Sequence, residues 1–310
     1  MELIVQEDYP RTLKDLEARF SNEQACRDYL CALRWPQGFL CVRCGGSKTW
    51  QLRSGRSQCA ACGHQLSVTA GTVFQDTRTP LTTWFRTMWW MTSQKNGISA
   101  LGLQRVLGLG SYQTAWTCLH KLRYAMVRPD RERLSGTVEV DEAWLGGLET
   151  GVVGRQIESK VLIAVAVEED GKGIGRIRMR FIPDASASSL IGFVQESVES
   201  GAVVHTDGWK GYASLQTNGY VHRVTVLKKN KESASELLPR VHLVISLLKR
   251  WLLGTHQGAV HPEHLDLYLE EFTFRFNRRK SRSRGKLFYR LAQQAVAVQP
   301  TTYRSIVDGE

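Results

Sequence analysis

Two aspartates follow apolar, β-branched runs whose alternation is typical of half-buried strands. Asp141 comes after Val138 and Val140, and Asp207 ends the apolar run that begins at Val203. A single carboxylate on a surface strand is usually a solvated group. Two carboxylates that separate strands bring to one edge of a sheet can bind a divalent ion, because Mg²⁺ and Mn²⁺ accept oxygen ligands. We therefore interpret Asp141 and Asp207 as ligands of a divalent metal ion.

A histidine and a lysine align on one side of a predicted helix. Pro239 opens this helix and Gly254 follows its expected end, the usual asymmetry of a single helix. At about 100° per residue, apolar side chains cover most of the circumference, and His242, Ser246 and Lys249 share the remaining stripe. Taken singly, such a His is usually a core residue and such a Lys a surface charge. Their alignment predicts that they face a polar cleft.

Four of the seven cysteines occur in two CxxC pairs separated by fourteen residues. The four are Cys41, Cys44, Cys59 and Cys62. Thiolates at this spacing are typical of a tetrahedral Zn²⁺ site. Four protein ligands leave no open position for water, so we expect a structural zinc ribbon and not a catalytic metal. Nearby basic residues make DNA contact an expected role of the ribbon; they are Arg43, Lys48, Arg53 and Arg56.

The composition favours a polyanionic partner. The 310-residue chain carries 41 Lys and Arg against 30 Asp and Glu, a net charge of +11, and such an excess favours nucleic acid. A basic membrane-surface protein is the competing class, but the basic residues alternate with Trp, Tyr and turn residues and do not follow one amphipathic helix. The longest apolar run, 161–167, is far shorter than the roughly 20 residues that span a bilayer. With no secretory signal either, we expect a cytoplasmic protein without a membrane partner.

The stretch 98–123 has the pattern of a helix-turn-helix motif. A short helix, a glycine turn and a cap at Ser111 precede a second helix with polar residues on one side. An ordinary helical hairpin is the alternative, because such patterns arise often by chance. The basic charge favours DNA binding, through outward-facing residues that we predict to be Gln113, Thr114, Thr117, His120 and Lys121.

The remaining pattern predicts a multidomain α/β protein. Two short helices precede the cysteines, and the second opens with a capping pattern at Ser21. Beyond a charged, turn-rich boundary, the expected elements are strands at 161–167 and 174–182, a helix at 187–200 and the strand that ends at Asp207. This order predicts a nuclease-like domain with a mixed sheet and flanking helices. The glycine-rich stretch 146–154 is expected to be a loop near its site.

The expected domains are four segments of the chain. They are N-terminal helices and a zinc ribbon at 1–75, a helical DNA-binding region at 76–134, a catalytic domain at 135–295 and a C-terminal tail at 296–310.

The chain resembles the DDE-type transposases of bacterial insertion sequences. The resemblance is to the group with an N-terminal zinc ribbon and a ribonuclease-H-like domain, in which Asn or His replaces the third carboxylate in some branches. It covers nearly the whole chain, and its matching stretches are 34–39 with the cysteine pairs, 138–142, 205–212, 247–256 and 268–279. The resemblance implies a C-terminal ribonuclease-H-like mixed sheet with flanking helices.

The resemblance also implies roles for single residues. The first and second aspartates of the family correspond to Asp141 and Asp207, and its lysine corresponds to Lys249. Seven residues before that lysine the standard pattern has Glu, and this chain has His242. The third metal ligand therefore stays open between His242 and a substituting acid; the acids considered are Glu139, Glu142, Glu270 and Glu271.

The implied reaction is DNA strand cleavage by water, followed by attack of the freed 3′-hydroxyl on target DNA. Two Mg²⁺ or Mn²⁺ ions about 3.5–4 Å apart catalyse such displacements. Asp141 would bridge them, Asp207 would hold one, and His242 would ligate the other or orient water on it. Lys249 would contact a phosphate. Imidazole suits Mn²⁺ better than Mg²⁺, so we expect Mn²⁺ to support more cleavage.

The expected partners are the terminal inverted repeats of the element and target DNA. A homo-oligomer is expected to assemble on this DNA. When bound to DNA, the protein would be nucleoid-associated in a bacterial cytoplasm. A basic track is expected to contact phosphates; its residues are Arg275, Arg278, Arg279, Lys280, Arg282, Arg284 and Lys286, with Lys228, Lys229 and Lys231. Two alternatives are a non-transposing nuclease on the same fold and a DNA-binding regulator with an inactive catalytic domain. The end sequence, the target preference, the oligomeric state and the choice between copy-out and cut-and-paste are not predicted.

Overall fold

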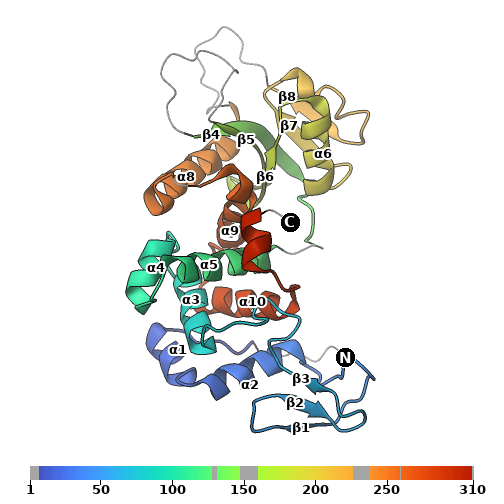
Figure 1. The fold of residues 1–310 in the computed structure, drawn as a ribbon. Helices are drawn as coiled ribbons and strands as arrows, with labels where there is room; N and C mark the ends of the chain where they lie inside the picture. Colours follow the sequence, from blue (N-terminus) through green and yellow to red (C-terminus); the bar gives the residue numbers. More distant parts are fainter. Residues whose placement is uncertain (1–6, 128–130, 147–159, 226–236, 259, 309–310) are drawn as a thin grey trace. The chain divides into compact units, whose positions relative to one another are not determined.

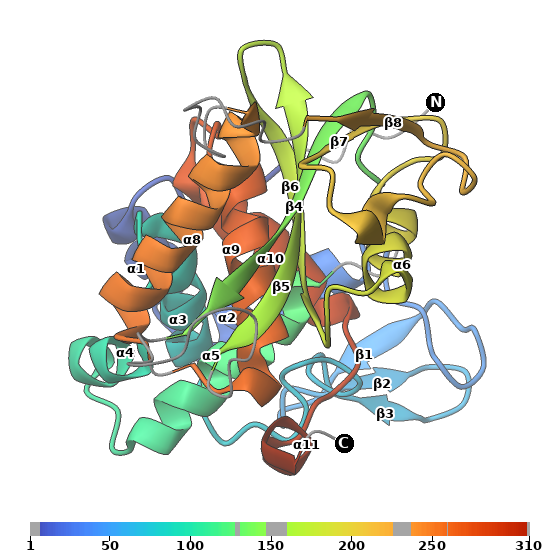
Figure 2. The ribbon, with the colours of Figure 1, turned by 90° about the horizontal axis from the view of Figure 1, so that it is seen from above.

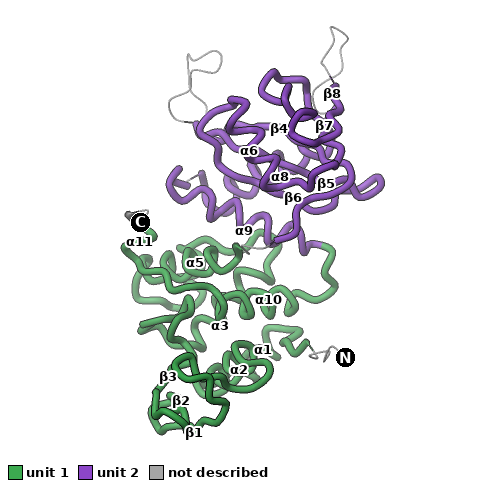
Figure 3. The backbone as a smooth tube through the Cα atoms, turned by 90° about the vertical axis from the view of Figure 1, so that its right-hand side faces the viewer, with its two compact units in different colours: residues 1–128, 280–310 green, residues 129–279 purple. Residues whose placement is uncertain are grey.

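A computed structural model describes residues 7–127, 131–146, 160–225, 237–258 and 260–308 (Figure 1). The expected loop 146–154, except for Gly146, and the lysines 228, 229 and 231 lie outside the described residues. The chain forms two compact units, which Figure 3 distinguishes by colour. The first consists of residues 1–128 and 280–310, and the second of residues 129–279.

The first unit begins with two capped helices. They are α1 (Leu13–Arg19) and α2 (Glu23–Arg34). The side chain of Thr12 accepts a hydrogen bond from the backbone N–H of Asp15, and that of Asn22 accepts one from Ala25. The capping pattern predicted at Ser21 is therefore one residue too early, because the Asn22 amide oxygen supplies the acceptor.

The C-terminal part of the chain completes the core of the first unit. Helix α3 (Leu81–Ser93) packs there with α10 (Arg284–Ala297), and α11 (Tyr303–Asp308) follows. The rings of Phe20 and Phe85 lie 4.6 Å apart, and that of Phe288 lies 5.6 Å from Phe85. The sequence placed residues up to 295 in the catalytic domain, whereas residues 280–310 cluster with the first unit. The reason is this aromatic cluster, which buries the apolar face of α10.

Helices α4 (Ala100–Leu107) and α5 (Tyr112–Met126) pack against each other across a short turn. Gly108 ends α4 in the left-handed conformation (φ 62°), and Ser111 caps α5 by accepting from the N–H of Thr114. The two helices, the glycine turn and the Ser111 cap are as predicted, and they fit both a helix-turn-helix motif and an ordinary helical hairpin. His120 was expected to face outward, but it is fully buried and its ring lies 4.0 Å from that of Trp116.

A small antiparallel sheet follows α2. Its strands, in the order β1-β2-β3, are β1 (Thr49–Gln51), β2 (Ser57–Cys59) and β3 (Gln65–Leu66). The strands are too short to build a core of their own, so the cysteines beside them must hold the ribbon together.

The second unit is built on a mixed five-stranded sheet with the order β6-β5-β4-β7-β8. Its strands are β4 (Thr137–Leu145), β5 (Val161–Asp170), β6 (Gly173–Ile182), β7 (Val203–Thr206) and β8 (Val221–Val224). The first three strands pair antiparallel, and β7 and β8 continue the sheet parallel to β4. This is a ribonuclease-H-like arrangement, as expected. Strand β8 was not predicted, because three of its four residues are exposed and no alternation marks it.

Helices cover the two faces of this sheet (Figure 2). They are α6 (Ala187–Ser197) with η1 (Lys210–Tyr212) on one face, and α8 (Pro239–His256) with α9 (Leu265–Asn277) on the other. Side chains of β4 point alternately to the two faces of the sheet and so contribute to a hydrophobic core on each face. Val138 and Val140 pack with α6, and Ala143 and Leu145 pack with α8. Helix α8 runs past Gly254, the predicted end, to a left-handed cap at Gln257.

Side chains of α9 cover the free edge of β6. The short helix η2 (Pro262–His264) leads into α9. Asp266 accepts from the N–H of Phe181 at 2.8 Å, and Asn277 both accepts from the N–H and donates to the carbonyl of Ile177. These bonds satisfy backbone groups that an edge strand would otherwise expose. None of the described helices is long and apolar enough to cross a bilayer.

Candidate active site

Asp141 lies in the middle of β4 on the face that packs against α8. The residue is 9% exposed, and its Oδ1 accepts a hydrogen bond from the N–H of Glu142 at 2.9 Å. Burial, followed by the charges of Glu142 and Asp207, raises the pKa of Asp141 to about 7. A positive charge beside this carboxylate would therefore stabilise its ionised form.

Asp207 directly follows the end of β7, which pairs with the first part of β4. The parallel register pairs Glu139 with His205, so Asp141 and Asp207 each lie two residues beyond a paired position on neighbouring strands. Oδ1 of Asp207 accepts from the N–H of Trp209 at 2.9 Å, which fixes the turn after the strand. The register brings the two predicted carboxylates side by side, and their mutual repulsion suits a site for a cation.

His242 enters the site from the first turn of α8. Its Nε2 lies 3.6 Å from Oδ2 of Asp141. Burial is the largest influence on its imidazole and lowers its pKa below the usual value, which favours the neutral ring with a free nitrogen lone pair. Lys249 and Ser246 are exposed on the same side of the helix, and the charge of Lys249 also lowers the pKa of His242.

The acids considered as alternative third ligands have other partners. Glu139 is fully buried and accepts from the backbone N–H groups of Arg240 and Val241 at 2.8 Å each. Glu142 faces the opposite side of β4 and accepts from the Tyr212 hydroxyl at 3.0 Å.

The two acids of α9 are also engaged away from Asp141. Glu270 forms an ion pair of 2.5 Å with Arg131, and Glu271 lies 3.6 Å from the Arg275 guanidinium. His242 is thus the third-ligand candidate that the structure brings beside Asp141.

The donor atoms of Asp141, Asp207 and His242 fit a divalent ion by their chemistry, with two carboxylates and one neutral imidazole. Their ligand atoms are more widely spaced than a closed site requires. Within the described ranges, the four cysteines are the one group of three or more such residues whose ligand atoms all lie within 4.8 Å of one another.

The four cysteines of the ribbon form a compact thiol cluster. The Sγ atoms of Cys41 and Cys62 lie 3.7 Å apart, and those of Cys44 and Cys59 lie 3.6 Å apart. The N–H of Arg43 is the largest of the influences that lower the pKa of Cys41 to about 7, which favours its thiolate. This arrangement fits one tetrahedral structural Zn²⁺.

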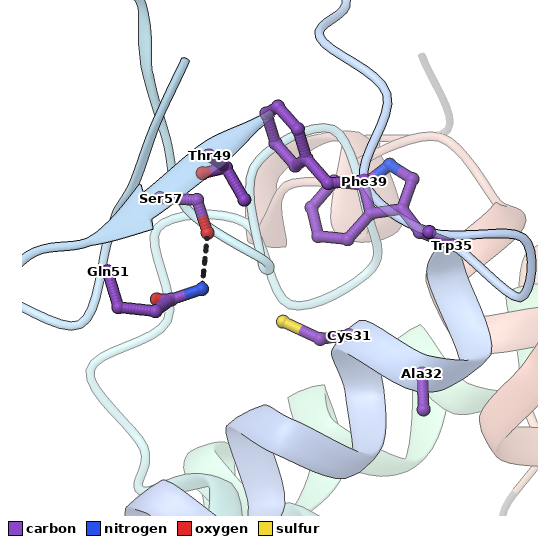
Figure 4. Close-up of a pocket in the computed structure, with 8 residues that line it drawn as sticks. Cys31, Ala32, Trp35, Phe39, Thr49, Gln51 and Ser57 are labelled. Carbon is purple, nitrogen blue, oxygen red and sulfur yellow. Dashed lines mark hydrogen bonds between the residues drawn. The ribbon is translucent and has the colours of Figure 1, made fainter. Parts of the chain in front are cut away.

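A cavity of about 240 Å³ lies beside the ribbon, between α2 and strands β1 and β2 (Figure 4). The rings of Trp35 and Phe39 form one side, at a centroid distance of 5.3 Å. On the other side Gln51 donates to the Ser57 hydroxyl at 3.1 Å. Sequence reasoning did not find this cavity, because its walls come from segments whose side chains carry no shared motif.

The residues predicted to bind DNA differ in exposure. On α5, Gln113 is exposed, Thr114 and Thr117 are half-buried, and burial lowers the pKa of the half-buried Lys121. Thr117 donates its hydroxyl proton to the carbonyl of Gln113.

In the predicted basic track, Lys280 is exposed. Arg275 lies against Glu271, and the guanidinium of Arg278 stacks on Phe274 at 4.0 Å. Arg279 donates to the carbonyls of Gly175 and Ile174 on β6.

Comparison with known proteins matches two parts of the chain to family models. Residues 21–65 match the transposase zinc-ribbon domain, and residues 133–277 match the ISXO2-like transposase domain. An uncharacterized protein in transposable element ISH50 of Halobacterium salinarum is 25% identical over 280 residues, which are 83% of this chain and 91% of that protein.

A search of solved structures finds a weaker likeness. The Mos1 mariner paired end complex with Mn matches over 69% of this chain and 75% of that chain, with 13% identity and a TM-score of 0.27.

Proposed function

The chain belongs to the DDE-type transposases of insertion sequences, and from this premise we propose that it binds the terminal inverted repeats of its element and catalyses metal-dependent cleavage and strand transfer. The ribbon and the helical region with α4 and α5 would recognise the ends. The second unit would carry the chemistry. A homo-oligomer assembled on DNA would hold two ends together.

The observation that carries this proposal is the meeting of Asp141, Asp207 and His242. They come from β4, the end of β7 and the start of α8, and Nε2 of His242 lies 3.6 Å from a carboxylate oxygen of Asp141. Three separate elements thus bring these side chains to the part of the sheet where β7 ends beside β4. The raised pKa of Asp141, caused first by burial and then by the neighbouring acids, is the kind of perturbation found at functional sites.

Each residue has a role that its position suggests. Asp141, Asp207 and His242 would hold the divalent ions, which when bound activate the attacking oxygen and stabilise the leaving oxygen. The exposed Lys249 would bind a phosphate of the DNA backbone, as a flexible ammonium does well. The fixed turn at Asp207 keeps its carboxylate in place.

The test is cleavage and joining of a labelled DNA that carries the terminal repeats, with Mg²⁺ or Mn²⁺ present. Asp141→Ala and Asp207→Ala should each lower the rate by at least about 10³-fold, because each removes a carboxylate metal ligand, and both should keep DNA binding. Glu196→Ala is the control, because this exposed acid pairs with Arg180 on the surface of the same unit.

Three other results would change the proposal. Cleavage without joined products would indicate a non-transposing nuclease. Specific binding without cutting, in either metal and with paired ends supplied, would indicate a regulator. Equal activity in Asp141→Ala and Glu196→Ala would rule out the assigned site.

A further inference from the structure

Among the described residues around the start of helix α8, the N-cap position provides no side-chain cap. Its N-cap residue is Leu238, which provides no side-chain acceptor, and Pro239 occupies the first turn. The next two backbone N–H groups, of Arg240 and Val241, have no partner within the helix and need an acceptor from elsewhere.

Glu139 of β4 supplies that acceptor. Its Oε2 accepts from both N–H groups at 2.8 Å, and its Oε1 accepts from Nη1 of Arg240 at 2.9 Å. The carboxylate is fully buried. A negative charge at the N-terminus of a helix is also favoured by the helix dipole.

This contact joins two parts of the candidate site. Glu139 lies two residues before Asp141 on the same strand and the same face, and the Val241 it caps lies one residue before His242. Arg240 holds the junction further, by donating to the carbonyls of Gly171 and Gly173. Glu139 therefore links the strand that carries Asp141 to the helical turn that carries His242.

We infer that Glu139 is a positioning residue, which fixes the first turn of α8 on β4 so that His242 meets the metal held by Asp141. It is not itself a ligand, since both of its oxygens serve the helix. This inference rests on the proposed function. A buried acid that aligns a ligand is expected to change metal affinity about 10–100-fold when removed.

The experiment measures Mn²⁺ binding to the protein, with electron paramagnetic resonance used to quantify the free Mn²⁺. Binding that is lost in Asp141→Ala is assigned to the candidate site. Glu139→Ala should raise the Mn²⁺ concentration needed for half-saturation of that site, the binding midpoint, about tenfold. The matched control is Glu168→Ala, because Glu168 is another mostly buried acid, on β5, whose carboxylate accepts from Arg176 and from the backbone N–H groups of Ser135 and Arg176, none of which belongs to α8. Thermal unfolding of Glu139→Ala and Glu168→Ala measures how much stability each variant loses, so that an effect on Mn²⁺ binding can be separated from general destabilisation.

Two further variants separate geometry from charge. Glu139→Gln keeps an oxygen at the helix terminus and should shift the midpoint less than threefold. Glu139→Asp keeps the charge but withdraws it by about 1.5 Å, and should shift the midpoint more than Gln does. Comparing the midpoint shift of Glu139→Gln with that of Glu139→Asp tests the inference even if Glu139→Ala does not fold.

A double-mutant cycle with His242→Ala completes the test. In that background Glu139→Ala should add no further loss of Mn²⁺ affinity. An undiminished loss there, a shift equal to that of Glu168→Ala, or a larger effect of Gln than of Asp would each overturn the inference. Wild-type protein that binds no Mn²⁺ at Asp141 and cuts no DNA would overturn the proposed function itself.

Discussion

Nε2 of His242 lies 3.6 Å from Oδ2 of Asp141, although the two residues come from a helix and a strand that are far apart in the sequence. The contact places an imidazole where the standard family pattern has a carboxylate. If His242 serves as the proposed third ligand, the site should favour Mn²⁺ over Mg²⁺, because nitrogen ligands suit Mn²⁺ better.

The first prediction concerns this preference. Wild-type protein should cleave faster with Mn²⁺ than with Mg²⁺, by about tenfold, and His242→Glu should narrow the difference by restoring an oxygen ligand. The measurement is the initial cleavage rate at saturating concentrations of each ion. Equal rates with both ions, unchanged in His242→Glu, would show that His242 is not a ligand.

The second prediction concerns stability and pH. Burial alone would raise the pKa of Glu168, but hydrogen bonds from Arg176 and from the N–H groups of Ser135 and Arg176 outweigh it and lower the pKa to about 2. A pKa lower in the folded than in the unfolded state stabilises the protein above the unfolded value near 4.5, and this contribution is lost as the pH falls towards 2.

Glu168→Gln should therefore lower the free energy of unfolding by about 1–3 kcal/mol at pH 7. The difference from wild type should shrink as the pH falls from about 4.5. Urea unfolding of both proteins between pH 7 and pH 3 measures it. A difference that stays constant over this range would mean that the charge of Glu168 contributes nothing.

The third prediction concerns the packing of α10 in the first unit. A Cβ atom on Gly285 would lie 1.7 Å from the carbonyl oxygen of Pro10, so backbone must move to admit it. Gly285→Ala should cost more than about 4 kcal/mol and lower the unfolding temperature of the first unit. Gly192→Ala is the control, because that helical position has open space and alanine should be neutral or stabilising there. A folded, equally stable Gly285→Ala would contradict this packing.

The fourth prediction separates two neighbouring basic residues. Lys280 is exposed, and Lys280→Ala should lower DNA affinity uniformly and reduce the salt slope by about 1. Arg279 binds carbonyls of β6, so Arg279→Ala should cost about 1–2 kcal/mol of stability. Binding titrations over a range of salt concentrations, with thermal unfolding beside them, distinguish the two. A salt slope unaffected by Lys280→Ala would remove this residue from the DNA contact.

The sequence by itself determined the elements that local patterns control. Apolar runs, alternating or continuous, predicted β4, β5, β6 and β7, and the spacing of the four cysteines predicted the thiol cluster that the structure shows. These signals are local, because the period of a strand and the spacing of metal ligands can be read within a few residues. The alignment of His242 with Lys249 on one side of α8 was readable for the same reason.

Only the tertiary structure decided which distant groups meet. Glu139 looked like a spare metal ligand beside Asp141, yet its oxygens cap α8. His120 looked like a polar surface residue, yet it is buried against Trp116, and α10 packs in the first unit through Phe288. Each outcome depends on a partner far along the chain, and one polar or aromatic side chain in a sequence does not specify which surface will bury it.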